Sequence, residues 1–289
     1  MQRIFHTPEG VRDIYSQECS RKQKLQEKLH RVFHQYGFED IETPTFEYFE
    51  VFSKEVGTIP SRDLYKFFDR EGNTLVLRPD FTPSVSRACA TYFNPEKEVV
   101  SLCYTGNTFI NNSSFRGRLK ETTQMGVERM GDDSPEADAE ILAMTVECLL
   151  ATGLTEFQVS VGQVDYYKAI FAQTGLSQEE EEELRELISQ KNYFGVEELV
   201  KNKNMDKSLA RVLSQLPQMF GSTEVLEKAK SLTDNPQALK AVARLEEIYE
   251  LLKVYGYEKY VTFDFAMLSK YHYYTGIIFQ AYTYVQEKR

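Results

Sequence analysis

Cysteine and histidine are scarce in this sequence, and neither follows the spacing of a metal site. The 289 residues contain four cysteines and four histidines. No two cysteines form a CxxC pair, so the spacing predicts reduced, mostly buried thiols. His30 and His34 lie four residues apart on an expected helix, but no third ligand is evident beside them. We therefore expect no metal centre, and we interpret the two histidines as one flank of a helix.

Long apolar runs and an excess of basic residues are also missing. No run is long enough to span a bilayer, and the first ten residues hold no apolar signal core, so we expect a cytoplasmic protein. The net charge of −10 argues against a large nucleic-acid surface, although a local basic patch could still serve one. With 42% hydrophobic residues, the chain can form one large domain or one domain with a substantial insert.

The first half of the sequence alternates helical and extended patterns. Apolar residues at helical spacing predict a helix over residues 16–36, and Gly37 is placed to end it. Thr82 before Pro83 predicts a helix N-cap, and so does Ser134 before Pro135. Strands are expected at 38–42 and 157–161, with a hairpin at 64–69 and 74–77. The aromatic residues of 45–56 predict a buried connector that is irregular or helical.

The stretch 101–131 is the centre of this pattern. It predicts two strands joined by a polar loop, with a small basic cluster of Arg116, Arg118 and Lys120. Gln124 and Glu128 lie four residues apart on the return strand, so their side chains face the same side. They could form the floor of a ligand pocket, or only an outward polar stripe. The basic cluster could bind an anion or nucleic acid, lie in solvent, or contact a partner subunit.

From about residue 165 to residue 255 strand patterns give way to short helices, and strands return at 260–265 and 276–285. We expect a core formed by residues 1–165 and 256–289, and a helical insertion at 166–255. Because the sequence ends directly after a strand, we expect the C-terminal part of the core fold to be absent.

Several segments together resemble the catalytic domain of the histidyl-tRNA synthetase family. The resemblance covers residues 1–165 and 260–285, with the order and spacing preserved. It rests on residues 7–13, 36–44, 77–82 (LRPDFT), 117–128, 138–140 (DAE) and 273–276 (YYTG). It implies an α+β fold of the class II aminoacyl-tRNA synthetase type, with an antiparallel sheet flanked by helices.

The departures from the synthetase pattern all fall on the ATP-binding half of the site. Ile110 and Ser269 stand where the family has catalytic arginines, and Asn112 replaces an acidic residue near the adenine. An isoleucine offers no donor or charge to a phosphate. The third motif, with its ATP-binding arginine, and an anticodon-binding domain are not found in this sequence. We therefore expect no catalytic residues and no cofactor.

The amino-acid half of the site matches the synthetase pattern better. The resemblance implies a histidine pocket formed by Asp80, Thr82, Gln124, Glu128, Tyr273 and Tyr274. Asp80 is one methylene shorter than the usual glutamate and could be a simple turn residue. If Tyr273 and Tyr274 lie on a strand, they point to opposite faces, so at most one would line the pocket.

A retained amino-acid half beside a lost ATP half resembles the regulatory subunits of ATP phosphoribosyltransferase, which are relatives of the synthetases. This resemblance implies a non-catalytic protein of histidine biosynthesis that assembles with a short catalytic subunit and serves feedback inhibition by histidine. It also implies a homodimer within a hetero-oligomer and no tRNA. From their charge, Arg116 and Arg118 are candidate anion or partner contacts. The alternatives are a truncated histidine–tRNA ligase and a stand-alone histidine-binding paralogue.

Overall fold

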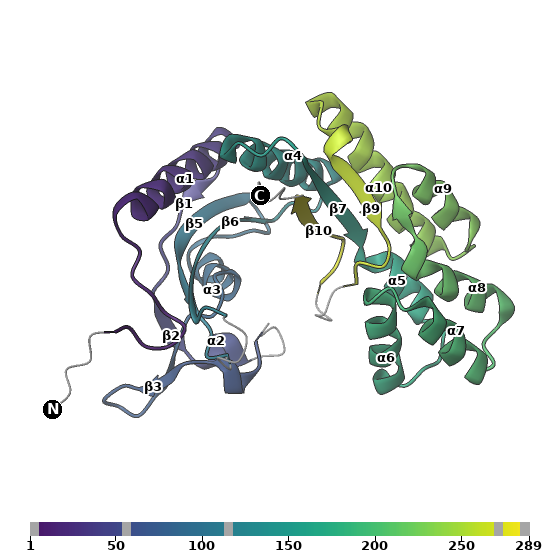
Figure 1. Ribbon diagram of the computed structural model, residues 1–289, viewed down its shortest axis with the longest axis horizontal. Coiled ribbons are helices and arrows are strands. Elements are labelled where there is room, and N and C mark those ends of the chain that lie inside the picture. Colours follow the sequence, from purple (N-terminus) through teal and green to yellow (C-terminus); the bar gives the residue numbers. More distant parts are fainter. Residues whose placement is uncertain (1–5, 54–58, 113–117, 269–273, 284–289) are drawn as a thin grey trace, which may run out of the picture. The chain divides into compact units, whose positions relative to one another are not determined.

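The computed structural model describes residues 6–53, 59–112, 118–268 and 274–283 (Figure 1). The chain divides into two compact units, Met1–Asp132 and Asp133–Arg289. This division follows from the contacts within the chain. It does not test the expected core at residues 1–165 and 256–289 or the expected helical insertion at 166–255, so both stay predictions.

The first unit contains two small sheets and two longer helices. Helices α1 (Ser16–Gln35) and α3 (Thr82–Tyr92) accompany a sheet of order β1-β5-β6, in which β1 (Glu39–Asp40) runs parallel to β5. Strands β5 (Val100–Phe109) and β6 (Glu121–Met130) pair antiparallel along their whole length. The second sheet joins β2 (Phe46–Tyr48), β4 (Thr74–Leu77) and β3 (Lys66–Phe68), with α2 (Glu50–Ser53) beside it.

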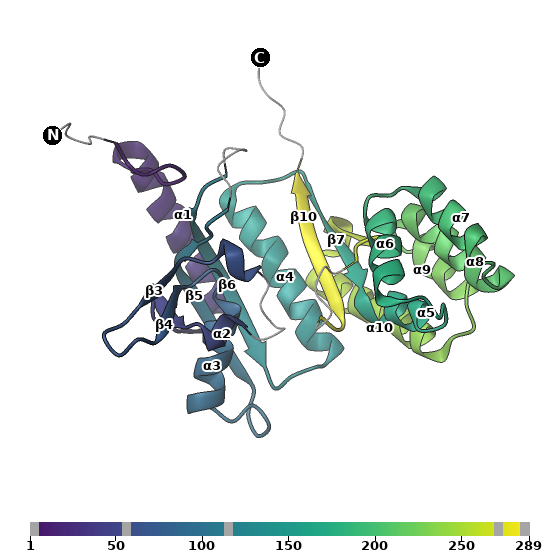
Figure 2. The same ribbon diagram turned by 90° about the horizontal axis from the view of Figure 1, so that it is seen from below.

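Strand β5 lies between helices α1 and α3 (Figures 1 and 2). Successive residues of a strand point to opposite faces, so each helix covers one set of its side chains. Leu102 and Tyr104 pack in one cluster with Val85 of α3. On the other face, Lys22 of α1 donates to the Thr123 hydroxyl at 2.5 Å. The two faces of the hairpin therefore have different neighbours.

The second unit combines a four-stranded sheet with helices. Its strand order is β10-β7-β9-β8, and only the β7–β9 pair is parallel. The elements are α4 (Pro135–Thr152), β7 (Phe157–Gln163), α5 (Val164–Phe171), α6 (Gln178–Ser189), α7 (Tyr193–Asn202), α8 (Lys207–Gln215), β8 (Phe220–Gly221), α9 (Glu224–Ser231), α10 (Pro236–Tyr255), β9 (Val261–Asp264) and β10 (Ile277–Thr283).

Most of the expected elements are present. The structure confirms the 16–36 helix, the two hairpins, and the helix that Ser134 caps by accepting a hydrogen bond from the Ala137 amide. The N-cap predicted at Thr82 is wrong. Thr82 is the first residue of α3, Phe81 precedes it, and the Thr82 hydroxyl donates instead to Glu128.

The aromatic connector at residues 45–56 was predicted to be buried, and this is only partly correct. The segment divides into β2 and α2, and the period of two in β2 turns Phe46 and Tyr48 outward, with exposed fractions of 49% and 54%. Glu47 between them is buried and accepts hydrogen bonds from Arg87, the shorter at 2.7 Å. Phe52 of α2 is buried as expected.

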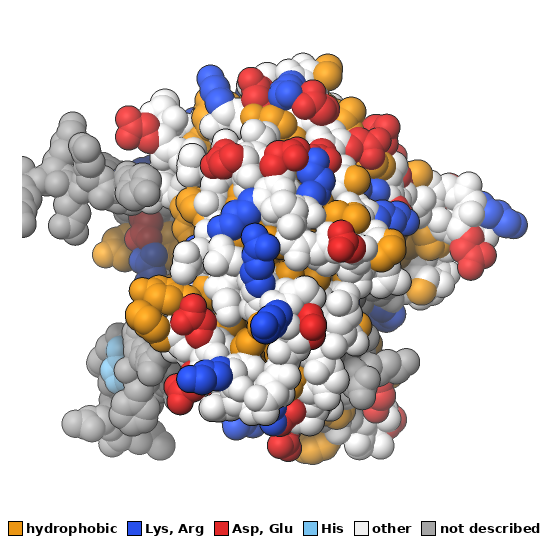
Figure 3. Space-filling model, turned by 90° about the vertical axis from the view of Figure 1, so that its right-hand side faces the viewer, with side chains coloured by type: hydrophobic (Ala, Val, Ile, Leu, Met, Phe, Trp, Pro, Cys, Tyr) orange, Lys and Arg blue, Asp and Glu red, His pale blue; other side chains and the backbone are white. Residues whose placement is uncertain are grey.

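None of the described helices is both apolar enough and long enough to cross a bilayer. On the side where α7 and α8 lie in Figure 1, acidic and basic side chains are interspersed with apolar ones (Figure 3). Among the described residues of that face, the basic side chains form no continuous field of the kind that binds nucleic acid.

Candidate functional site

The candidate pocket lies on one face of the β5–β6 hairpin. In the antiparallel register, Gly106 is opposite Gln124, Tyr104 is opposite Gly126, and Leu102 is opposite Glu128. Directly opposite residues point to the same face, so Tyr104, Gln124 and Glu128 share it. The structure therefore supports the expectation that Gln124 and Glu128 face one side, and it adds Tyr104 between them.

Two glycines make room for a stack of planar side chains beneath this face. The guanidinium carbon of Arg78 lies 4.1 Å from the centre of the Phe81 ring, and the Phe81 ring stacks on Tyr104 at 4.3 Å with an interplanar angle of 7°. A Cβ atom on Gly106 would lie 2.5 Å from Arg78 Nη2 and 2.7 Å from Phe81 Cζ. A Cβ atom on Gly126 would lie 2.6 Å from Tyr104 Cζ. The stack thus requires glycine at both positions.

Arg78 holds this stack in place through the backbone and is not available to a ligand. Its side chain is buried and donates to the carbonyl oxygens of Thr43 at 2.8 Å and Asn107 at 2.9 Å. These bonds tie the segment after β4 to the hairpin, and they place Asp80 and Thr82 over the pocket face.

Asp80 and Thr82 meet the hairpin side chains directly. The Thr82 hydroxyl donates to Glu128 Oε1 at 2.6 Å. The Gln124 amide approaches Asp80 Oδ1 at 3.5 Å and the Tyr104 hydroxyl at 3.4 Å, which are long for hydrogen bonds. Asp80 Oδ1 also accepts from the Phe81 amide at 2.7 Å. Four of the six predicted pocket residues are thus brought together.

The pocket face is acidic, and no described cationic side chain pairs with its carboxyl groups. Burial raises the pKa of Glu128, and the nearby Asp80 raises it further against the opposing hydrogen bond from Thr82. Burial, followed by the charges of Glu128 and Asp80, raises the pKa of Tyr104. Among the described residues, no Lys or Arg forms an ion pair with Asp80 or Glu128. Two carboxyl groups without a counter-ion provide a site for a ligand ammonium group.

The remaining predicted site residues belong to the second unit, to the segment before β6, or to the part of the chain outside the described residues. Tyr274 belongs to the second unit, where its side chain is 39% exposed and its carbonyl oxygen accepts from Lys168 at 2.6 Å. Arg118 is exposed and lies in the segment that leads into β6. Tyr273 and Arg116 lie outside the described residues, as does Ser269.

Tyr104 was not predicted as a pocket residue, although a signal for it exists. In the alternating pattern of the first strand, Tyr104 shares a face with Leu102. The glycine at position 126 of the return strand marks a place where a large side chain can approach the backbone closely. Only the pairing of the two strands shows that Tyr104 and Gly126 lie opposite each other.

Comparison with known proteins gives the same fold. The family model of histidyl-tRNA synthetase matches residues 10–288. The solved histidyl-tRNA synthetase of Nostoc sp. PCC 7120 aligns with a TM-score of 0.80 at 21% identity, covering 97% of this chain and 65% of its own. The expected α+β, class II synthetase-like fold is confirmed. The described sheets are mainly antiparallel, with two parallel pairs.

Relatives with higher sequence identity show which family within this fold the chain resembles. A regulatory subunit of ATP phosphoribosyltransferase from Acetivibrio thermocellus is 41% identical over 97% of this chain and 67% of its own length. A regulatory subunit from Clostridium acetobutylicum is 37% identical over 96% and 69%. The solved "ATP phosphoribosyltransferase regulatory subunit/histidyl-tRNA synthetase" from Bacillus halodurans C has a TM-score of 0.88 at 31% identity, covering 98% of this chain and 74% of its own.

The chain belongs to the family of ATP phosphoribosyltransferase regulatory subunits, within the wider histidyl-tRNA synthetase family. It spans about two thirds of the length of the curated relatives named above.

Proposed function

We propose that this chain is a non-catalytic subunit that assembles with the short catalytic subunit of ATP phosphoribosyltransferase. In that role it would support the first step of histidine biosynthesis and its feedback inhibition by histidine. The names of its relatives support this proposal, because each is a regulatory subunit of that enzyme. A homodimer within a hetero-oligomer is the assembly that we propose.

The pocket on the β5–β6 hairpin is the proposed histidine site. The observation that carries this assignment is the pair of carboxyl groups, Asp80 and Glu128, which share the pocket face and form no ion pair with a lysine or arginine among the described residues. The α-ammonium group of an amino acid would supply the missing charge, and the pKa of Glu128 would then fall toward its ordinary value. Gln124 and the Tyr104 hydroxyl are the polar groups nearest to this pair.

The absence of ligase activity is proposed from the ATP half of the site. Ile110 follows β5 directly, and its amide donates to the Lys120 carbonyl at 2.9 Å. Its side chain has no group that could hold a phosphate oxygen, and in other enzymes the loss of one preorganised donor costs about 3 kcal/mol. Asn112 at the adenine side and Ser269 at the second arginine position weaken the case for ATP use further.

Two measurements test the proposal. We expect the full-length protein to co-elute with the short catalytic subunit on size-exclusion chromatography and to confer histidine-sensitive activity on it. We also expect no ATP–pyrophosphate exchange in the presence of histidine. A protein that exchanges pyrophosphate and stays separate from the catalytic subunit would be a histidine–tRNA ligase. Histidine binding with neither property would indicate a stand-alone paralogue.

A further inference from the structure

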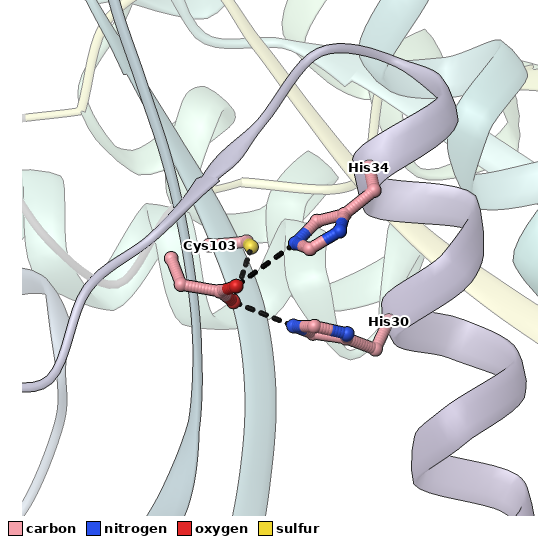
Figure 4. A group of neighbouring side chains, drawn as sticks. His30, His34 and Cys103 are labelled. Atoms are coloured by element: carbon pink, nitrogen blue, oxygen red, sulfur yellow. Dashed lines mark hydrogen bonds and ion pairs between the residues drawn. The ribbon is translucent and has the colours of Figure 1, made fainter.

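The face of β5 that lies opposite the pocket carries a second group of functional side chains. His30 and His34 of α1, Asp40 of β1 and Cys103 of β5 direct their polar atoms toward one point (Figure 4). One potential ligand atom from each of the four residues lies within 4.8 Å of the others. The sequence showed only the two histidines, and the fold adds the carboxylate and the thiol.

The backbone explains why these four residues meet. His30 and His34 are one helical turn apart, so they share a face of α1. Asp40 and Cys103 are direct partners in the parallel β1–β5 register. The strand pair therefore presents a carboxylate and a thiol side by side, at the place where α1 presents two imidazoles.

The carboxylate of Asp40 is at the centre of the group. Its two oxygens lie 2.5 Å from His30 Nε2 and 3.0 Å from His34 Nε2. The Cys103 thiol donates to Asp40 Oδ1 at 3.4 Å, and the two imidazole rings are 4.1 Å apart. Both histidines thus direct the same type of nitrogen inward.

We propose that His30, His34, Asp40 and Cys103 form a binding site for Zn²⁺ or a similar divalent transition-metal ion. Two imidazoles, one thiolate and one carboxylate are ligands typical of zinc, whereas Mg²⁺ and Ca²⁺ select oxygen ligands. A shell of four protein ligands is typical of a structural site. The ion would link the C-terminal half of α1 to the sheet.

The spacing of the donors suits a tetrahedral ion. Bonds of about 2.0 to 2.3 Å place tetrahedral ligand atoms roughly 3.2–3.8 Å apart. The Asp40 oxygens lie 2.5 Å from His30 Nε2, 3.0 Å from His34 Nε2 and 3.4 Å from Cys103 Sγ. All four potential ligand atoms lie within 4.8 Å of one another, so the observed distances lie on both sides of the tetrahedral range. Ion binding would replace these hydrogen bonds with metal–ligand bonds, so the His30 and His34 nitrogens would move apart from the Asp40 oxygens.

The site is also open to an entering ion. The side chains of His30, His34 and Asp40 are 40%, 46% and 56% exposed, and Cys103 lies buried behind them. Burial, with a smaller effect from Asp40, raises the pKa of the Cys103 thiol to about 12. Ion binding would form the metal–sulfur bond and release the thiol proton to solvent.

Titration of the full-length, metal-free protein with Co²⁺ tests this site, because cobalt substitutes for zinc and is coloured. We expect one ion per chain, the visible bands of tetrahedral cobalt, and a near-ultraviolet sulfur-to-cobalt charge-transfer band. Stoichiometric Zn²⁺ should then remove all of these signals. Zn²⁺ added to the metal-free protein should also raise its unfolding temperature.

Matched variants assign the ligands. Cys103→Ser should remove the charge-transfer band, and His34→Gln should weaken Co²⁺ binding by at least about 100-fold, since even changes behind the ligands cost about 10–100-fold. Cys19→Ser, a thiol change elsewhere on α1, and His6→Gln should change neither signal. If Cys103→Ser fails to fold, the exposed His34→Gln variant carries the test.

The proposal is overturned by the absence of cobalt binding, or by a charge-transfer band that persists in Cys103→Ser. It is also overturned by octahedral cobalt bound without sulfur. In each of these cases the group would serve only as a hydrogen-bonded clamp, in which two imidazoles hold the carboxylate of Asp40.

Discussion

The two faces of β5 differ in almost every physical property, although they are separated by a single step along the strand. Tyr104 is buried beside the carboxyl groups of Glu128 and Asp80, and Cys103 is buried behind two partly exposed imidazoles and a carboxylate. The alternation of side chains in a strand is enough to separate them. One strand can therefore serve two sites, since each face takes its chemistry from a different helix.

The electrostatic contrast between the faces follows from their partners. On the pocket face the carboxyl group of Glu128 has hydroxyl neighbours and a second acid, and burial raises its pKa. On the other face the hydrogen bond from His30 is the main cause that lowers the pKa of Asp40. The first carboxyl group lacks an ion-pair partner among the described residues, and the second has two imidazole partners.

The stack beneath the pocket should be the most sensitive part of this contrast. Phe81→Ala removes a ring that is 1% exposed and that separates Arg78 from Tyr104. We expect a loss of about 3–5 kcal/mol in the free energy of unfolding, as for other buried phenylalanines. Urea denaturation measures it. Phe68→Ala, at a side chain that is 72% exposed, should change the value by less than about 0.5 kcal/mol.

Glu128→Gln on the pocket face should weaken ligand binding, whereas the same substitution on the opposite face should not. The variant keeps the shape and the acceptor for Thr82 but loses the charge, so we expect histidine affinity to fall about 10–100-fold. Isothermal titration calorimetry measures the change. Glu121→Gln makes the same substitution on the opposite face of β6, where Glu121 accepts from Asn107 at 2.7 Å, and should leave affinity unchanged. Equal affinities for both variants would remove Glu128 from the site.

The same substitution should change how stability depends on pH. A carboxyl group with a raised pKa binds its proton more tightly in the folded state, so its contribution is present below the ordinary glutamate pKa. This contribution is lost as the pH rises through the raised value. The free energy of unfolding of Glu128→Gln relative to the native protein should therefore increase from acid to neutral pH, and saturating histidine should weaken this trend. A difference that is constant with pH would contradict the raised pKa.

The smallest change in the free energy of unfolding is expected for a substitution on the exposed face, measured with a chelator that removes any bound metal ion. His34→Gln removes one of the two imidazole partners of Asp40, and the side chains of His34 and Asp40 are about half exposed. Such pairs contribute about 0.2–1 kcal/mol, so the free energy of unfolding should fall by no more than this at neutral pH. Because the pKa of Asp40 is lowered, the difference should vanish as the pH falls through that value. A loss of several kcal/mol under chelation would mean that the imidazole has a structural role without any metal.

Local patterns were sufficient for much of the fold. The period of α1, the glycine at position 37 after it and the Ser134 cap depend on residues close together in the chain, and all three were predicted correctly. The prediction failed at Thr82 and at Phe46 and Tyr48. At those positions a distant partner, or the outward face of a short strand, outweighed the local preference.

The sequence by itself determined the family, the elements and the residue types that a histidine pocket would need. Only the tertiary structure decided which of these residues meet. Asp80 joins Gln124 across 44 positions, and Cys103 joins Asp40 across 63 positions. Strand register and the seating of Arg78 and Phe81 create these contacts, and both depend on pairing between segments that no local pattern encodes.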